Sequence, residues 1–199
     1  MATPMPRNIK VHLAIFASGG GSNAQQICSY FSHHPWIDIS LIVTNNPNAG
    51  VLKVADAFGI PSCVLSKEKR SDKEYMFTLL KQHHVDYIIL AGYLLLIPDW
   101  LIARFHNKIL NIHPSLLPKY GGKGMYGHHV HQAVYDHRDA ISGMTIHVVN
   151  EEFDKGEILF QKSVAITEDM MPNDIASAVL RLEHRFYSEV IEKYITSHQ

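Results

Sequence analysis

Short apolar runs alternate with amphipathic stretches along the first 112 residues of the chain. The apolar runs predict buried strands over residues 9–16, 37–43, 62–65, 86–90 and 108–112. The stretches between them predict helices over residues 22–31, 51–58 and 72–83, and leave an apolar segment over residues 94–105. Strands that are apolar throughout and separated by helices are typical of a parallel sheet covered on both faces. The pattern therefore predicts an α/β fold.

The pattern changes in the last third of the chain. Residues 141–150 and 158–166 read as strands joined by a loop too short for a crossover helix, so we expect them to pair antiparallel. Helical spacing predicts a long helix over residues 172–195, with a buried face formed by Ile175, Val179, Leu182, Phe186 and Val190. Without an internal repeat or a linker, residues 1–199 are expected to form one domain. Its sheet should be open, twisted, mostly parallel and Rossmann-like, with an antiparallel C-terminal end.

Composition narrows the class of protein. A hydrophobic fraction of 46% and a charged fraction of 19% are usual for globular proteins, and no apolar run approaches the roughly 20 residues of a membrane span. Eighteen basic and nineteen acidic residues give no electrostatic sign of nucleic-acid binding. Cys28 and Cys63 lack metal-site spacing, and residues 1–7 lack the apolar core of a signal peptide. These features predict a cytoplasmic protein that binds neither membrane nor nucleic acid.

A glycine-rich stretch follows the first predicted strand, with the sequence SGGGSN over residues 18–23. Glycines let a ligand approach the backbone closely, and the free N–H groups of the next helix attract an anion such as phosphate. Gly19, Gly21 and Ala24 match the spacing of a dinucleotide fingerprint. The second strand ends in Thr44-Asn45-Asn46 without the acidic residue that binds ribose, which disfavours a nicotinamide cofactor. The alternative is a plain strand-to-helix turn.

The strongest candidates for catalytic side chains lie in the stretch ILNIHPSLLP, over residues 109–118. Asn111 and His113 stand two residues apart, so on a strand they point to the same side. An amide donor beside an imidazole is suited to polarising a carbonyl group and moving a proton. Pro114 and Pro118 then end the regular structure. The alternative is a strand end whose polar side chains only satisfy loop backbone.

A glycine-rich loop and a histidine cluster follow. Residues 119–127, KYGGKGMYG, indicate either a mobile flap near the site or a plain surface loop. His128, His129 and His131 suggest a metal site, and His128 and His131 would share a helix face. No nearby cysteine or clear carboxylate completes a coordination set. We therefore predict no metal.

The sequence NEEFDKGE, over residues 150–157, lies between the two late strands. In it Asp154 stands between Phe153 and Gly156. Phe153 is expected to pack inward, and Gly156 to adopt an unusual backbone angle. Such a loop would hold Asp154 in a fixed place. A simple hairpin turn explains the same residues, and the sequence alone does not choose between the two.

Taken in order, these motifs closely resemble the phosphoribosylglycinamide formyltransferases of purine biosynthesis. The resemblance rests on residues 18–23, on NIHPSLLP over residues 111–118, and on GMTIHVV over residues 143–149 leading to Asp154-Lys155-Gly156. It runs from about Val11 to about Tyr187. It implies an enzyme that transfers the formyl group of 10-formyltetrahydrofolate, a cosubstrate, to the amine of glycinamide ribonucleotide.

The resemblance also implies roles for single residues. Asn111, His113 and Asp154 match the catalytic trio of the family. The amine attacks the formyl carbon directly, so Asn111 and a protonated His113 would donate hydrogen bonds to the formyl oxygen, where charge develops. Asp154 would stabilise the imidazolium and assist proton transfer.

Binding residues follow from the same resemblance. The phosphate would lie at Gly21, Ser22 and Asn23, and the ribose at Glu183. The folate would bind against an apolar wall formed by Leu94, Leu95, Leu96 and Ile97, next to Asn111.

Two features depart from the family pattern, and other functions stay open. Leu95 stands where relatives often carry a basic residue, and the loop over residues 120–127 looks longer than in many of them. Arg70 or Lys73 is the candidate for a basic folate contact. Methionyl-tRNA formyltransferase and formyltetrahydrofolate deformylase share the Asn-x-His core, but each resemblance would require a further domain. A non-catalytic nucleotide-binding module is the alternative from another class. The chain is expected to be a monomer or a homodimer.

Overall fold

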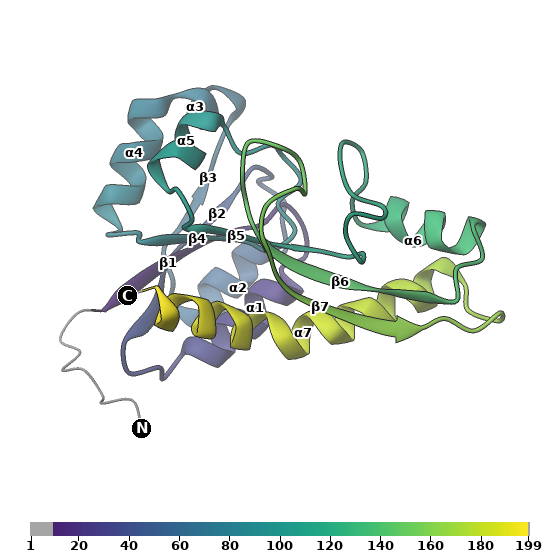
Figure 1. Cartoon of the computed structure of the whole chain (residues 1–199). Helices are drawn as coiled ribbons and strands as arrows, with labels where there is room; N and C mark the ends of the chain where they lie inside the picture. Colours follow the sequence, from purple (N-terminus) through teal and green to yellow (C-terminus); the bar gives the residue numbers. More distant parts are fainter. Residues whose placement is uncertain (1–9, 199) are drawn as a thin grey trace.

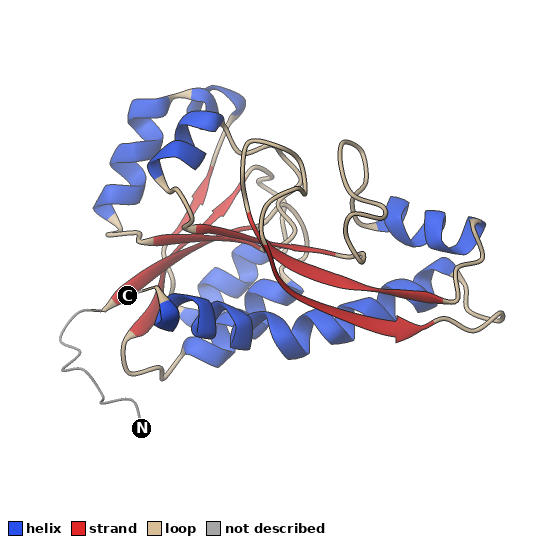
Figure 2. Ribbon diagram, in the orientation of Figure 1, coloured by secondary structure: helices blue, strands red, loops and turns tan. Residues whose placement is uncertain are grey.

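The computed structural model describes residues 10–198 and shows one seven-stranded sheet with helices on both sides (Figures 1 and 2). The strands are β1 (Val11–Phe16), β2 (Ile37–Thr44), β3 (Ser62–Val64), β4 (Tyr87–Leu90), β5 (Ile109–His113), β6 (Ile141–Val148) and β7 (Ile158–Ala165). The helices are α1 (Ser22–Phe31), α2 (Val51–Phe58), α3 (Lys67–Ser71), α4 (Lys73–Gln82), α5 (Asp99–Arg104), α6 (His128–Asp136) and α7 (Pro172–Ser197). Ile9, the predicted start of the first strand, and residues 1–7 lie outside the described residues.

The strand order is β3-β2-β1-β4-β5-β6-β7. Neighbours from β3 to β5 pair parallel, whereas β6 pairs antiparallel with both β5 and β7. The predicted fold, including its antiparallel C-terminal end, is confirmed. The order of the strands reverses between β1 and β4, and open α/β sheets bind ligands at the carboxyl end of this switch point.

The central strands of the sheet are buried on both faces, as β1 shows. Its Leu13 and Ile15 belong to the core that contains α1, α2 and α7, while Ala14 and Phe16 belong to the core that contains α4 and α5. Figure 1 shows these two groups of helices on opposite sides of the sheet. A strand covered on both faces has no polar face, which explains the continuous apolar runs of the sequence.

The buried face of α7 differs from the predicted one. Ile175 and Val179 are buried as expected, but the stripe then continues through Glu183, Tyr187 and Ile191, at intervals of four residues. The remaining predicted members, which are only partly buried, are Leu182, Phe186 and Val190. The sequence pattern missed the true face because a glutamate interrupts it.

In the described part of the chain, no helix has the length and apolar composition needed to cross a membrane.

Helices α3 and α5 were not predicted, and α6 was considered only as a helix face that His128 and His131 could share. The apolar segment over residues 94–105 divides into a loop and α5, with Pro98 at the helix N-cap. Helix α3 buries none of its side chains, and its start is capped by Ser66, whose Oγ accepts a hydrogen bond from the Lys69 N–H at 3.3 Å. Helices of one or two turns are too short to give a hydrophobic period, so the sequence does not indicate them.

Candidate active site

A cavity of about 700 Å³ opens at the carboxyl edge of the sheet, beside the switch point. Its walls come from the loop after β4, from β5 and β6, from residues 122–128, from the loop before β7 and from α7. The predicted site residues that line it are Asn23, Leu94, Leu95, Leu96, Ile97, Asn111, His113, Asp154 and Glu183. The fold therefore gathers side chains that stand up to 160 residues apart in the sequence.

The glycine loop lies next to this cavity. Gly21 has φ 83° at the N-cap of α1, and a Cβ there would lie 2.7 Å from the Cα of Val51, so both backbone angle and packing require glycine. Gly19 and Gly20 are exposed, and a Cβ on either would meet no heavy atom within 4 Å. Ser22 is exposed at the start of α1, where helix N–H groups lack intrahelical partners. Gly21 and Ser22 flank the cavity rather than line it.

Ser18 braces the glycine loop against its neighbours. Its Oγ donates a hydrogen bond to Asn45 Oδ1 at 2.6 Å and accepts one from the Leu94 N–H at 3.0 Å. Its own N–H donates to the Gly92 carbonyl at 3.0 Å. Asn45, which follows β2, therefore supports the loops after β1 and β4.

Asn23 and Glu183 meet inside the cavity. Asn23 Nδ2 donates a hydrogen bond to Glu183 Oε2 at 2.7 Å. Burial raises the pKa of Glu183 to about 7, while the hydrogen bond from Asn23 acts in the opposite direction. The predicted phosphate-binding and ribose-binding regions are thus joined by one buried contact.

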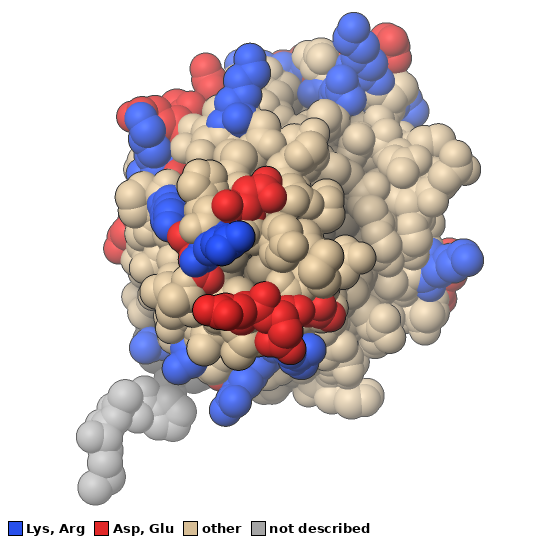
Figure 3. Space-filling model, turned by 90° about the vertical axis from the view of Figure 1, so that its right-hand side faces the viewer, with Lys and Arg blue, Asp and Glu red and all other residues tan. Residues whose placement is uncertain are grey.

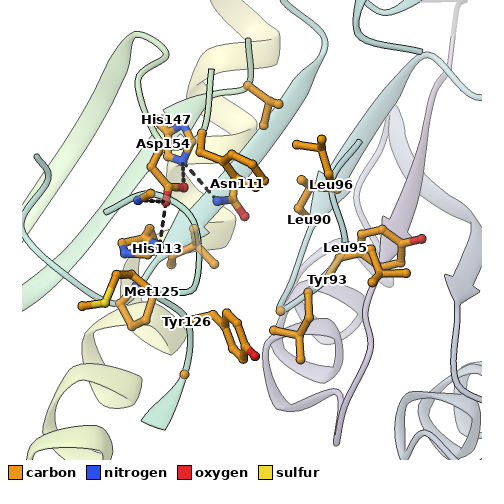
Figure 4. A pocket seen from close by; sticks show the side chains of 18 of the residues that line it. Leu90, Tyr93, Leu95, Leu96, Asn111, His113, Met125, Tyr126, His147 and Asp154 are labelled. Carbon is orange, nitrogen blue, oxygen red and sulfur yellow. Dashed lines mark hydrogen bonds and ion pairs between the residues drawn. The ribbon is translucent and has the colours of Figure 1, made fainter. Parts of the chain in front are cut away.

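Asn111 is oriented by a residue that the sequence reasoning missed, His147 on β6. Asn111 Nδ2 lies 3.1 Å from His147 Nε2, and His147 Nδ1 lies 3.0 Å from the Val148 carbonyl oxygen. A carbonyl only accepts, so Nδ1 carries the proton and Nε2 of the neutral ring accepts from Asn111. One N–H and the carbonyl oxygen of the Asn111 amide remain for a ligand (Figure 4).

His113 is held by its other ring nitrogen. Its Nε2 lies 2.8 Å from the Tyr120 carbonyl oxygen, so Nε2 carries a proton and Nδ1, 3.7 Å from Asp154 Oδ2, is the atom that gains or loses one. Burial lowers the pKa of His113 below its ordinary value, although Asp154 and the Tyr120 carbonyl act to raise it. Burial therefore favours the neutral ring in the unliganded site, whereas the expectation of a protonated His113 concerns the reaction itself.

Asp154 lies between the two histidines. Its Oδ2 accepts a hydrogen bond from the Gly122 N–H at 2.9 Å, and its Oδ1 lies 3.6 Å from His147 Nε2. Burial acts to raise the pKa of Asp154, but the Gly122 N–H and the positive charge that His147 or His113 carries when protonated outweigh it and hold the pKa below its ordinary value. Asp154 is therefore an ionised carboxylate at neutral pH.

The backbone of this loop corrects two expectations. Asp154 itself has φ 53°, whereas Gly156 has no positive φ. Glycine is needed at 156 for close packing, because a Cβ there would overlap the Val148 carbonyl oxygen. Phe153 does not pack inward but is 44% exposed at the edge of the cavity. The loop fixes its acid through a left-handed aspartate, a conformation that Asp tolerates better than most residues.

Strand pairing explains why His147 belongs to the site. In the β5–β6 register Asn111 pairs with His147, and His113 with Thr145, so all four side chains share one face. Thr145 Oγ1 donates a hydrogen bond to the Ser115 carbonyl at 2.6 Å and accepts one from the Leu117 N–H at 3.0 Å. The polar residues on either side of Ile146, Thr145 and His147, were the sequence signal for this face.

The opposite wall of the cavity is apolar (Figure 4). Leu94 and Leu96 are 53% and 55% exposed, while Ile97 is buried. Leu95 is partly buried. Large apolar side chains left exposed at a cavity are typical of a surface that a ligand covers.

The two basic candidates for this wall stand outside it. Arg70 does not line the cavity, but its charge acts on Tyr93, which does. Lys73 Nζ lies over the ring of Phe77, 5.6 Å from its centroid. Of the two, Arg70 is the one near the cavity.

The three histidines of the cluster on α6 differ in burial. His131 is buried, and burial lowers its pKa to about 4, whereas His128 and His129 are exposed. Within residues 10–198 no group of three or more His, Cys, Asp or Glu side chains is placed to hold a metal ion. On the face shown in Figure 3, acidic and basic side chains intermingle around a broad area that carries neither.

The fold and the site together define an α/β protein with a cavity of small-ligand size beside the switch point of its sheet. The family model described as "Formyl transferase" matches residues 11–191, and the chain belongs to this family.

Known proteins extend the similarity. The chain is 44% identical to "Phosphoribosylglycinamide formyltransferase, chloroplastic" of Arabidopsis thaliana, over 94% of this chain and 65% of the relative. It is 35% identical to the Bacillus subtilis "Phosphoribosylglycinamide formyltransferase", over 92% of this chain and 93% of the relative. The crystal structure of the enzyme of that name from Bacillus halodurans superimposes with a TM-score of 0.84 at 31% identity, covering 94% of this chain and 97% of the other. The predicted resemblance to this group is confirmed. The chain spans about two thirds of the Arabidopsis relative and 59% of its Vigna unguiculata counterpart.

Proposed function

We propose that the chain transfers the formyl group of 10-formyltetrahydrofolate to the amine of glycinamide ribonucleotide. The names of its relatives support the reaction, and membership in the formyl transferase family supports formyl folate as the cosubstrate. The observation that carries the proposal is the convergence of Asn111, His113 and Asp154 on one cavity with an apolar wall. Such a site pairs groups for a developing oxyanion with a surface for a flat heterocycle.

The reaction needs no protein nucleophile. The substrate amine attacks the formyl carbon and forms a C–N bond, and negative charge develops on the formyl oxygen. Collapse of this intermediate breaks the bond between the formyl carbon and N10 of the folate. The amine loses a proton, and N10 gains one. The protein therefore has to stabilise an oxyanion and move protons.

In this mechanism Asn111 donates its remaining N–H to the developing oxyanion, because His147 occupies the other one. His113 begins neutral and takes up a proton at Nδ1 as the reaction proceeds. Both the oxyanion and Asp154, 3.7 Å from Nδ1, favour the charged imidazolium. Asp154 thus balances the charge of His113 when that charge is needed.

The substrates are placed by the same geometry. The phosphate would bind at the start of α1, at Gly21, Ser22 and Asn23, where free N–H groups and the helix dipole attract an anion. The ribose would contact Glu183, which Asn23 holds in place. The pterin would lie against the apolar wall of Leu94, Leu95, Leu96 and Ile97, with Arg70 as the nearby cation.

The phosphate position is testable without disturbing the fold. Gly21→Val would collide with Val51, so it tests folding rather than binding. Ser22→Asp instead places a carboxylate in the first turn of α1, where it favours the helix and repels phosphate. We expect about tenfold weaker binding of glycinamide ribonucleotide by calorimetry, and no change for Gln26→Asp one turn later. Equal affinities in all three proteins would place the phosphate elsewhere.

The activity test is incubation of the protein with 10-formyltetrahydrofolate, with and without glycinamide ribonucleotide, followed by mass spectrometry. Formylated ribonucleotide and tetrahydrofolate in equal amounts support the proposal. Formate released without the ribonucleotide would indicate a deformylase, and ribonucleotide binding without turnover would indicate a nucleotide-binding module. His113→Ala should abolish most turnover, whereas His33→Ala, an exposed histidine, should not.

We further propose that the chain acts in the cytoplasm as a monomer or homodimer and needs no metal. Cell fractionation with antibodies against the chain tests the compartment. Sedimentation velocity and dialysis against a chelator test the other two properties.

A further inference from the structure

One short segment, residues 119–122, contacts both His113 and Asp154. The Tyr120 carbonyl accepts the proton of His113 Nε2 at 2.8 Å, and the Gly122 N–H donates to Asp154 Oδ2 at 2.9 Å. A Cβ on Gly121, between them, would collide with the Leu117 side chain and lie 3.3 Å from the Cβ of Asp154, so the segment packs closely against both residues. A shift of this segment would move both partners of the proposed proton-transfer pair.

The conformation of the segment is not one that its sequence favours. Tyr120 has φ 56°, in the left-handed region that a bulky side chain seldom occupies. Such a residue persists only where surrounding contacts hold it, and strain of this kind is found at functional sites. The unusual backbone angle of Tyr120 therefore calls for an anchor.

Asp139, in the turn between α6 and β6, supplies this anchor. Its Oδ2 accepts a hydrogen bond from the Tyr120 hydroxyl at 2.9 Å, and both of its oxygens accept from Lys119 Nζ at 2.7 and 2.8 Å. Burial acts to raise the pKa of Asp139, but Lys119, Tyr120 and His137 outweigh it and lower the pKa. The Lys119 side chain is 59% exposed, so its ion pair contributes little. Ser115 Oγ holds the backbone of the segment through the Lys119 carbonyl at 2.6 Å, and the Tyr120 hydroxyl is the contact that fixes the tyrosine ring.

We propose that Asp139 is a positioning residue for the reaction, acting through Tyr120 on His113. The carboxylate fixes the Tyr120 ring, the ring keeps its backbone carbonyl aimed at His113 Nε2, and the carbonyl keeps the reactive nitrogen Nδ1 facing Asp154. The role of Asp139 in turnover rests on the proposed function. The contact from Asp139 to the His113 ring does not.

The sign of the effect on His113 follows from the groups around it. Burial and the neighbouring His147 disfavour the charged form of His113, whereas Asp154 and the Tyr120 carbonyl favour it. A charge on His131 of α6 would also disfavour it. Removing the carbonyl contact therefore lowers the pKa of His113 further. Because His113 begins neutral in the proposed mechanism, the limb of the rate profile that rises with pH should move to lower pH.

Two variants test the proposal. Tyr120→Phe removes only the hydroxyl, and Asp139→Ala removes its acceptor. Lys119→Met is the control, because it removes the exposed ion pair and leaves the tyrosine contact. We expect both test variants to lower kcat about tenfold, with the Michaelis constants of both substrates within about twofold of wild type. The double variant should match the worse single one, since both changes break one contact.

The second readout is the ¹⁵N NMR spectrum of the His113 ring in the folded, unliganded protein. Wild type and Lys119→Met should show the Nε2–H tautomer. Tyr120→Phe and Asp139→Ala should show a tautomer mixture and a lower pKa. If wild type lacked transfer activity while these spectra changed as expected, the proposed function would fail and the Asp139 contact would stand. Unchanged spectra in both variants, or raised Michaelis constants with unchanged kcat, would overturn the positioning role.

Discussion

The two walls of the cavity are built in opposite ways (Figure 4). The polar wall, formed by Asn111, His113, His147 and Asp154, rests mainly on adjacent strands, and its side chains contact one another. The apolar wall comes from the loop after β4, and Leu94 and Leu96 on it are more than half exposed.

This difference corresponds to two tasks. Groups that act on a developing charge must be fixed beforehand, because rearranging them during the reaction would cost part of the gain. A surface that binds a flat ring needs only apolar area, and a loop provides it. We therefore expect changes in the polar wall to act on kcat and changes in the apolar wall to act on the Michaelis constant.

The largest effect on kcat should come from separating Asp154 and His113. Asp154→Asn removes the charge that favours protonated His113, so the pKa of His113 should fall and kcat should drop by about 10²- to 10³-fold. His113→Ala should be about as damaging, and the double variant little worse than the worse single one. Turnover against pH measures all three, with Asp136→Asn, an exposed aspartate on α6, as control. Strictly additive losses would show that the two residues work independently.

A second effect concerns the free energy of unfolding and its dependence on the protonation of Glu183, which lines the cavity. The pKa of Glu183 is about 7 in the folded chain and 4.5 in its ordinary state, so the folded state binds more protons between these values. Stability from the neutral carboxyl is complete below about pH 4.5 and is lost as the pH rises through about 7. Relative to Glu183→Gln, the wild type should lose on the order of 3 kcal/mol over this window.

Urea unfolding at a series of pH values gives this difference. Glu189→Gln, an exposed glutamate on the same helix, is the matched control and should run parallel to wild type. A wild-type curve that stays parallel to Glu183→Gln would mean that Glu183 is ionised in the fold.

A third effect should separate the walls. Leu94→Asp places a charge on the apolar wall and should raise the Michaelis constant for formyl folate about tenfold, with little change in kcat or in the constant for the ribonucleotide. Val64→Asp, an exposed apolar residue on β3 that does not line the cavity, should have no such effect. Steady-state kinetics with each substrate varied in turn decides. A matching rise in both constants would move the folate away from Leu94.

The smallest effect is expected at Phe153. Because this ring is 44% exposed, Phe153→Ala should change the free energy of unfolding by no more than about 0.5 kcal/mol. The Michaelis constant for folate should rise about threefold, since the ring adds apolar area at the cavity edge. Chemical denaturation and steady-state kinetics measure the two quantities. A large loss of stability would show that Phe153 packs inward after all.

The sequence by itself determined the elements with a clear hydrophobic period and the residues with a fixed local arrangement. Largely apolar runs predicted β1, β2, β4 and β5, because strands covered on both faces carry few polar side chains. Asn111 and His113 were predicted to share a face because side chains alternate along a strand. Gly21 was predicted at a tight turn, and its left-handed angle has that local cause.

Only the tertiary structure decided which residues meet and which protonation states they adopt. His147 joins Asn111 through the antiparallel register of β5 and β6, which depends on partners 36 residues apart. Tyr120 reaches His113 through a backbone carbonyl, a group that every residue carries and no motif reveals. The lowered pKa of His113 and the raised pKa of Glu183 follow from burial, and burial is a property of the whole packed chain.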